Sequence, residues 1–207
     1  MLNHAKTRVV ISARAEQILA EDIRQRHDIE ACGLLLGHVD SDGSWHIERA
    51  RPLRNIHNSP SYFEFAPEDL LEAELDHPGE IVGVYHSHPT GLRVASGTDR
   101  DNMRRVNIEQ NIPWVWLIIS GPFKLDNSQE KGELSLIAYH HYHESGLQQI
   151  PIQLEGLERA YTTSGRTVRV VRVAGVVGVV TVVGVVVVRG LMLWIKQLLC
   201  HRNPSLK

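Results

Sequence analysis

The chain has 207 residues, with 22 lysines and arginines against 24 aspartates and glutamates and a formal net charge of −2 at pH 7. That length accommodates one domain with a sizeable core and some additional chain, and the nearly balanced charge argues against a nucleic-acid-binding protein. The two cysteines, Cys32 and Cys200, are far apart and form no C-x-x-C motif, which argues against a disulfide framework and favours a reducing compartment.

In the first half of the chain, short apolar runs alternate with segments of helical character. Ser12 is a typical N-cap residue and Pro67 is typical of a first helical turn, so each marks the expected start of a helix. The polar residues at 40–44 predict a turn between two strands. We expect helices at 13–26 and 67–75, and strands at 8–12, 34–37, 45–53 and 62–65.

The second half contains three apolar runs that predict buried strands. The run 80–85 is nearly continuous and rich in β-branched residues, which is typical of a strand buried on both faces, and Pro89 ends it. A helix is expected to begin at Ser96, and further strands are expected at 113–120 and 134–139. Strands interleaved with helices predict an α/β layered sheet.

The most informative motif is H-x-H-x7-S-x2-D, formed by His86, His88, Ser96 and Asp99. Side chains two apart in a strand point to the same face, so the two histidines face one way, roughly 7 Å apart at Cα. Imidazole nitrogen and carboxylate oxygen are preferred zinc ligands, and a catalytic zinc keeps three protein ligands and one open position. The motif therefore predicts one zinc ion per chain, held by His86, His88 and Asp99.

Two of these positions have a second interpretation. Ser96 and Asp99 have the spacing of a capping box, with Ser96 as the N-cap and Asp99 as the acid at N3. Taken alone, this common pattern is the better explanation. The neighbouring H-x-H favours the metal role, because the loop must return Asp99 to the carboxyl end of the strand.

A zinc hydrolase also needs a base that is not itself a ligand, and Glu30 is the best candidate. It precedes the apolar run that begins at Gly33, so we expect it at one end of the sheet. The alternative is a solvated acid in a turn, which is the usual environment of a glutamate. Nearby Cys32 is expected to be a small buried side chain.

Glu30 within E-A-C-G-L-L-L-G, together with His86-x-His88, Ser96 and Asp99, resembles the signature of the JAMM metalloproteases, or MPN+ domains, and above all their compact prokaryotic members. The resemblance implies a three-layer, cytidine-deaminase-like (MPN) fold with a mixed central sheet. It also implies zinc at His86, His88 and Asp99, with Glu30 as the general base and Ser96 as a donor to the developing oxyanion.

The resemblance extends over about 7–143 and implies a zinc-dependent peptidase or isopeptidase. Its substrate would be the C-terminal tail of a ubiquitin-like protein, and specifically of a sulfur carrier, since the compact prokaryotic members act on such carriers. One alternative is a non-catalytic scaffold of the same fold, although the chain keeps every signature residue. Another is a different zinc hydrolase, but the H-x-E and P-C-x-x-C motifs of deaminases and the H-E-x-x-H motif of zincins are absent.

A second group of histidines, Tyr139-His-His-Tyr-His143, follows a predicted strand. It lacks a cysteine or a clearly spaced acid, so we expect a solvated strand end rather than a metal site. Trp114 and Trp116 alternate within a strand, which indicates packing rather than a binding surface.

The C-terminal segment differs from the rest in composition, because 168–188 consists almost only of valine and glycine. We therefore expect a catalytic domain at 1–153 and an irregular, low-complexity tail at 154–207. The resemblance does not extend to this tail.

The tail has two interpretations. The uncharged run 173–188 is shorter than the roughly twenty residues that span a bilayer, but 173–195 is long enough if Arg189 is tolerated at some cost. This segment is either a membrane anchor or an unstructured tail that tends to aggregate. Because the N-terminus lacks the apolar region of a secretory signal, we expect a cytoplasmic protein, membrane-associated if the tail is an anchor.

Overall fold

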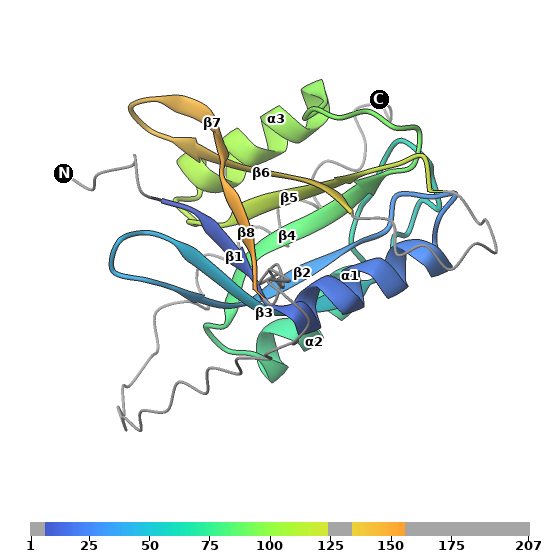
Figure 1. The fold of residues 1–207 in the computed structure, drawn as a ribbon, viewed down its shortest axis with the longest axis horizontal. Coiled ribbons are helices and arrows are strands. Elements are labelled where there is room, and N and C mark those ends of the chain that lie inside the picture. Colours follow the sequence, from blue (N-terminus) through green and yellow to red (C-terminus); the bar gives the residue numbers. More distant parts are fainter. Residues whose placement is uncertain (1–6, 124–133, 156–207) are drawn as a thin grey trace, which may run out of the picture. The chain divides into compact units, whose positions relative to one another are not determined.

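The structure is a computed structural model, and it describes residues 7–123 and 134–155. In these residues an eight-stranded sheet has the order β7-β6-β5-β4-β2-β3-β1-β8 (Figure 1). The strands are β1 (Val9–Ile11), β2 (Cys32–Val39), β3 (Trp45–Leu53), β4 (Ile81–His88), β5 (Val115–Ser120), β6 (Ser135–Tyr142), β7 (Gly146–Ile150) and β8 (Ile152–Leu154). The helices are α1 (Ala13–Gln25), α2 (Pro67–Asp76) and α3 (Gly97–Arg104), and α3 continues into the π-helical turn η2 (Arg105–Glu109).

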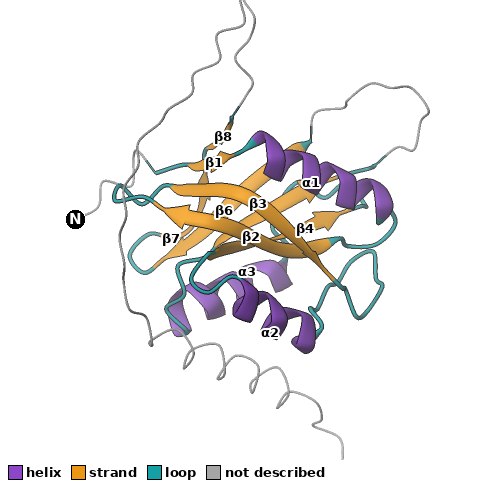
Figure 2. Ribbon diagram, turned by 90° about the horizontal axis from the view of Figure 1, so that it is seen from below, coloured by secondary structure: helices purple, strands orange, loops and turns teal. Residues whose placement is uncertain are grey.

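The sheet is mixed and is covered on both faces. Strands β4 and β5 run parallel, as do β1 and β3 and β1 and β8, whereas β2 is antiparallel to both of its neighbours. Helix α1 lies on one face of the sheet, and α2 and α3 lie on the other (Figure 2). The predicted three-layer α/β fold with a mixed central sheet is therefore confirmed.

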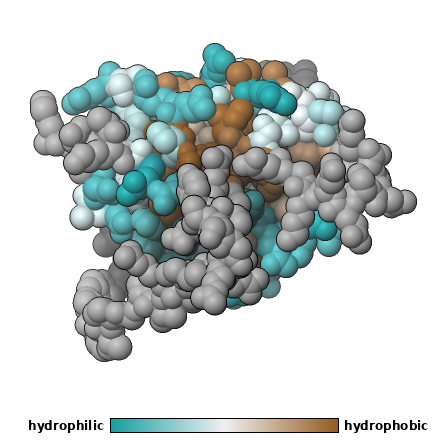
Figure 3. Space-filling view, viewed as in Figure 1, coloured by the Kyte–Doolittle hydropathy of each residue, from teal (hydrophilic) through white to brown (hydrophobic). Residues whose placement is uncertain are grey.

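The main hydrophobic core lies between α1 and the sheet. Helix α1 buries Ala15, Leu19 and Ile23, which belong to one cluster with apolar side chains of the central strands. On the face shown in Figure 3, apolar side chains gather in the middle of the described residues, with hydrophilic side chains around them. Strands β4 and β5 approach so closely at Gly83 that a Cβ there would lie 2.2 Å from the carbonyl oxygen of Val115. This explains a glycine inside a buried strand.

A buried polar network ties α1 to the strands that carry the candidate site. The guanidinium of Arg26 pairs with Asp22 and donates to the carbonyl oxygens of Leu53 (2.7 Å) and Cys32 (2.9 Å). The hydroxyl of Tyr85, in β4, donates to Asp22 over 2.7 Å. The C-terminal end of α1 is thereby fixed to the start of β2 and the middle of β4. Cys32 itself is fully buried, as expected.

Most of the expected elements are present, but the strand expected at 62–65 is wrong. In this segment the backbone forms only an isolated bridge between Asn55 and Phe65. The side chain of Asn55 takes the place of a ladder, because its amide nitrogen donates to the carbonyl oxygen of Tyr62 (3.0 Å) and its oxygen accepts from the amides of His57 (3.1 Å) and Glu64 (3.4 Å). A buried asparagine thus stabilises an irregular loop. The aromatic residues of this loop favour a strand by propensity, which explains the wrong prediction.

The sheet ends at β8, next to the first strand. The amide of Val9 donates to the carbonyl oxygen of Pro151, and the amide of Glu155 donates to that of Ile11. The chain divides into two units, Met1–Gly156 and Leu157–Lys207. The second unit, and with it the candidate anchor at 173–195, lies outside the described residues. Within the described part of the chain, no helix has both the length and the hydropathy needed to cross a bilayer.

We predict that a protein ending at Gly156 folds and keeps the activity of the full chain. A protein ending at residue 153 should be less stable by about 1–3 kcal/mol, because it loses Leu154 and the bond from Glu155 to Ile11. Urea unfolding of the two truncated proteins, with hydrolysis measured on both, checks this. Failure of the longer protein to fold would show that the tail contributes to the core.

Candidate functional site

The two histidines of the motif lie at the end of β4. Alternate side chains of a strand point to opposite faces, so Tyr85 faces α1 while His86 and His88 face the other helical layer. His86 is fully buried, and His88 is 3% exposed. Phe63 stacks on the His86 ring with a centroid separation of 4.7 Å. The strand and its neighbours thus hold both rings in fixed orientations.

Asp99 meets these histidines from the first turn of α3. One carboxylate oxygen lies 3.2 Å from Nε2 of His86, and the other lies 3.4 Å from Nε2 of His88. The two Nε2 atoms are 3.0 Å apart. The two strand residues and the helix residue therefore present their ligand atoms to one point, and together they could hold a metal ion.

The chemistry of these atoms fits a zinc ion. His88 Nδ1 donates to the carbonyl oxygen of Leu92 over 2.9 Å, so Nε2 of the neutral ring carries a lone pair. That lone pair faces a second imidazole nitrogen and a carboxylate, an arrangement that a cation stabilises. Bonds of about 2.0–2.2 Å in a tetrahedron place ligand atoms roughly 3.3 Å apart, and the separations between these three side chains are close to this value.

Burial and mutual contacts determine the charge states of the three side chains. Burial lowers the pKa of His86 and so favours the neutral ring that can bind a metal. Burial would also lower the pKa of His88, but its bonds with Asp99 and Leu92 outweigh this and raise it. Burial would raise the pKa of Asp99, whereas its close contacts with His86 and His88 lower it well below the usual value. Asp99 is therefore ionised at neutral pH.

Glu30 is placed beside His88 by the pairing of β2 with β4. Cys32 is the register partner of His86. One residue further along, Ser87 lies opposite Ala31. The Ser87 amide donates to the carbonyl oxygen of Ala31 (2.8 Å), and the Ser87 Oγ accepts from the Ala31 amide (2.9 Å). One further step brings Glu30 opposite His88. The register thus explains why a residue far away in the sequence reaches the histidines.

The Glu30 side chain is 6% exposed, and its carboxylate makes no hydrogen bond to the described residues. Burial raises the pKa of Glu30 to about 7, with the charge of Asp99 acting in the same direction and that of His88 against it. The alternative of an ordinary solvated acid is therefore wrong, because the residue is almost entirely buried. A group whose pKa lies near neutrality is suited to accept and return a proton.

Ser96 is the N-cap of α3, and the capping box is present. Its Oγ accepts from the amide of Asp99 (3.1 Å), and the Asp99 carboxylate accepts from the amide of Ser96 (2.7 Å). The capping and metal-binding interpretations of Asp99 are thus compatible, since one carboxylate makes both sets of contacts. The hydroxyl hydrogen of Ser96 has no acceptor among the described residues, and it is available to a ligand.

One pocket connects these groups. It has a volume of about 140 Å³, and its lining includes Glu30, His88, Ser96 and Asp99. The loop 55–65 contributes Ser61, Tyr62 and Phe63 to its wall, and the turn after β4 contributes Thr90 and Leu92. His86 lies beneath the pocket, fully buried. The structure therefore brings all five residues predicted from the motif to one place.

Sequence patterns give no indication of the residue that supports Glu30. Asn55 is buried, and its amide nitrogen donates to the carbonyl oxygen of Glu30 (3.0 Å) as well as to that of Tyr62. It therefore links the backbone of Glu30 to the loop that forms the pocket wall. An asparagine in a polar loop is usually exposed, so only its buried environment reveals this role.

The second histidine group is not a solvated strand end throughout. His140 is 8% exposed, and its Nδ1 contacts the carbonyl oxygen of Trp114 at 2.9 Å. Its ring packs against Trp45. In the described residues this group forms no cluster that could hold a metal. Trp114 and Trp116 are buried, as their alternation predicts.

Residues 12–136, more than half of the chain, match the family described as prokaryotic homologs of the JAB domain. Over 113 residues the chain is 34% identical to a desampylase from Pyrococcus furiosus, a match that covers 52% of this chain and 72% of that protein. Over 94 residues it is 31% identical to the CysO-cysteine peptidase of Mycobacterium tuberculosis, covering 44% of this chain and 62% of that protein.

The fold also matches a solved structure. A solution structure of a protein from Desulfitobacterium hafniense superposes with a TM-score of 0.54 at 25% sequence identity. The match covers 71% of this chain and 92% of that chain. The elements that carry the candidate site thus belong to an architecture that also occurs in a solved protein.

Proposed function

Because the chain belongs to the family of prokaryotic homologs of the JAB domain, that is, to the JAMM metalloproteases, we propose that it is a zinc-dependent peptidase or isopeptidase. The convergence of His86, His88 and Asp99 on one point, beside a buried and unbonded Glu30 carboxylate, is the observation that carries the proposal. A scaffold protein would not need an enclosed acid next to a set of metal ligands.

The three ligands would hold one zinc ion per chain. When bound, zinc supplies a water molecule of lowered pKa and polarises the scissile carbonyl group. Glu30 would accept the proton of the attacking water and return it to the leaving amine, a role open to a carboxylate that lines the pocket without being a ligand. Ser96 directs its free hydroxyl hydrogen toward the developing oxyanion. The amide of Asn55 fixes the backbone carbonyl of Glu30.

For the substrate, we propose the C-terminal tail of a ubiquitin-like protein of the sulfur-carrier type. The names of two relatives, a desampylase and a CysO-cysteine peptidase, support this class. Tyr62 and Leu92 are exposed at the pocket, and Val94 is exposed nearby, so apolar surface is available to a protein substrate.

The proposal is tested with two forms of one ubiquitin-like sulfur carrier. In the first, an amino acid is joined to the C-terminal glycine by a peptide bond; in the second, that glycine is joined to a lysine side chain. Zinc-loaded full-length protein should release the intact carrier from at least one form, as detected by mass spectrometry. An unrelated unstructured peptide is the control and should be cut much more slowly. Cleavage of neither form, or equal cleavage of the peptide, would contradict the substrate class.

Ser96 has two expected roles, and two substitutions separate them. Ser96→Ala should lower hydrolysis by about 10²–10³-fold, as for the loss of one oxyanion donor, and also cost about 1 kcal/mol of stability through the lost cap. Ser96→Gly should lower hydrolysis as much but cost only a few tenths of a kcal/mol, because glycine is a tolerated N-cap. Rates and urea unfolding measured on both variants check this. If Ser96→Gly retains a normal rate, Ser96 is only a cap.

A further inference from the structure

A second group of metal-binding side chains lies at the other end of β2, on the hairpin with β3. His38 and His46 are register partners in the antiparallel pair, so their side chains leave the sheet on the same face. Their rings are stacked, with centroids 4.9 Å apart and planes within 6° of parallel. The strand pairing itself thus fixes two imidazoles side by side.

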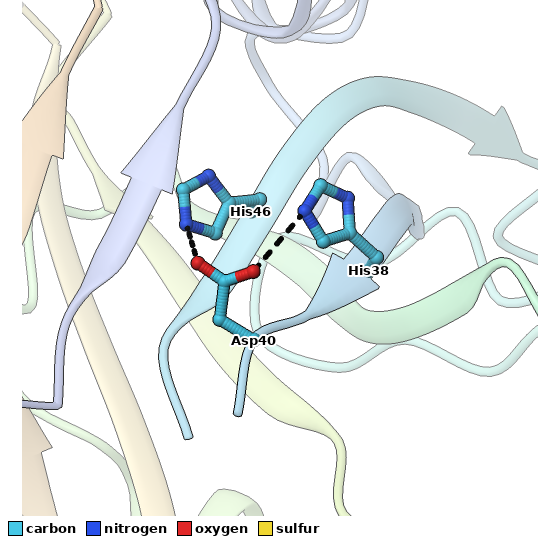
Figure 4. Close-up of side chains that lie close together, drawn as sticks. All are labelled: His38, Asp40 and His46. Carbon is cyan, nitrogen blue, oxygen red and sulfur yellow. Dashed lines mark ion pairs between the residues drawn. The ribbon is translucent and has the colours of Figure 1, made fainter. Parts of the chain in front are cut away.

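Asp40 completes the group from the turn between the strands. Figure 4 shows its carboxylate between the two rings, with one oxygen directed at each. The Nε2 atom of His46 lies 2.8 Å from one oxygen, and that of His38 lies 3.5 Å from the other. The turn is itself bonded, since the amide of Asp40 donates to the carbonyl oxygen of Ser44 and the amide of Gly43 donates to that of Asp40. The carboxylate is therefore presented by an ordered segment.

A fourth side chain orients one of the rings. Oε1 of Glu48, in β3, lies 3.1 Å from Nδ1 of His38. A carboxylate at this position accepts the Nδ1 hydrogen and leaves the Nε2 lone pair directed at the Asp40 side. A carboxylate behind a histidine is the usual second partner of a metal-binding imidazole, and it makes the ring a stronger ligand.

We propose that His38, Asp40 and His46 bind a divalent transition-metal ion of the zinc type, separately from the candidate active site. Their ligand atoms lie within 4.8 Å of one another, so small side-chain rotations would bring them around one ion. Two imidazoles and a carboxylate suit zinc and its neighbours better than magnesium or calcium. The site lies roughly 20 Å along β2 from Cys32, which is the end of the strand close to Glu30.

The group is largely exposed to solvent. The side chains of His38 and Asp40 are about half exposed, at 55% and 47%, and exposed pairs of this kind contribute little stability. An ion, in contrast, is accessible from solvent here and can complete its coordination with water. Because the ligands come from β2, the turn and β3, a bound ion would fasten the tip of the hairpin.

Zinc binding to metal-stripped full-length protein tests the proposal. The His88→Ala variant serves as the parent, because it lacks a ligand of the candidate active site. Equilibrium dialysis against Zn²⁺, followed by metal analysis, should find one zinc fewer per chain after adding either His38→Asn or His46→Asn. Glu48→Gln should weaken this zinc by about 10–100-fold. His143→Asn, at an exposed histidine outside the group, is the matched control and should leave the zinc content unchanged.

Thermal unfolding gives a second measurement. Zinc should raise the melting temperature of His88→Ala, since an ion that binds only the folded state stabilises it, and His38→Asn should reduce that rise. Equal zinc content and an equal rise with and without His38 and His46 would overturn the proposal. The same two substitutions in the wild-type chain should also remove one zinc, whether or not the candidate active site holds metal. The result is therefore independent of the proposed enzymatic function.

Discussion

Replacing Glu30 with glutamine is expected to lower hydrolysis by about 10²–10⁴-fold, the usual effect of removing a general base. Glutamine fills nearly the same volume in the buried position but cannot accept a proton. Because Glu30 is not one of the three side chains whose ligand atoms converge, the zinc content should not change. Turnover of a peptide-linked carrier and metal analysis of the same preparation check both parts.

Glu74→Gln is the matched control for this substitution. Burial raises the pKa of Glu74 as it does that of Glu30, but Glu74 lies in α2 and is not part of the pocket lining. We expect Glu74→Gln to keep the full rate. A Glu30→Gln protein that still turns over at a rate close to normal would show that another group accepts the proton.

Replacing His88 with alanine is expected to remove one zinc per chain and to reduce hydrolysis to the level of chelator-treated protein. Of the three proposed ligands, the substitution leaves His86 and Asp99, and a catalytic zinc typically needs three. Metal analysis and turnover on the same preparation provide the measurement. Adding zinc should restore the activity of chelator-treated wild-type protein but should not restore the activity of the variant.

His77→Ala is a suitable control, because His77 is a histidine at the end of α2, outside the pocket. It should keep both the zinc and the rate. Equal zinc content in His88→Ala and in the wild-type chain would contradict the assignment of this ligand. Lost zinc with retained hydrolysis would contradict the zinc-dependent mechanism instead.

The ligand pattern could be predicted from the sequence because it depends on local geometry. His86 and His88 share a face through the two-residue repeat of a strand, and Asp99 follows in the first turn of the next helix. For Glu30, the sequence predicts only that the residue lies at one end of the sheet. Its contact with the histidines depends on the register between β2 and β4, and pairing between strands so far apart in the chain is not encoded in either strand alone.

The pocket wall could not be predicted, for a related reason. Tyr62 and Phe63 lie in an aromatic run that favours a strand by propensity, yet they belong to a loop organised by the buried amide of Asn55. Propensity describes a residue and its neighbours, whereas this loop is determined by one side chain that satisfies several backbone groups at once. The short strands β7 and β8 were not expected either, because their alternation is too brief to stand out.

Asp99 contacts both the cap of α3 and the two histidines, and this has a consequence for metal binding. The same carboxylate that faces the two histidines also begins α3 by accepting from the backbone of Ser96. Its rotamer is therefore fixed by the fold before any ion arrives, and the entropy of ordering this ligand is spent during folding rather than during loading. Loading and stripping should then leave this frame in place, with the metal-free chain keeping its helix.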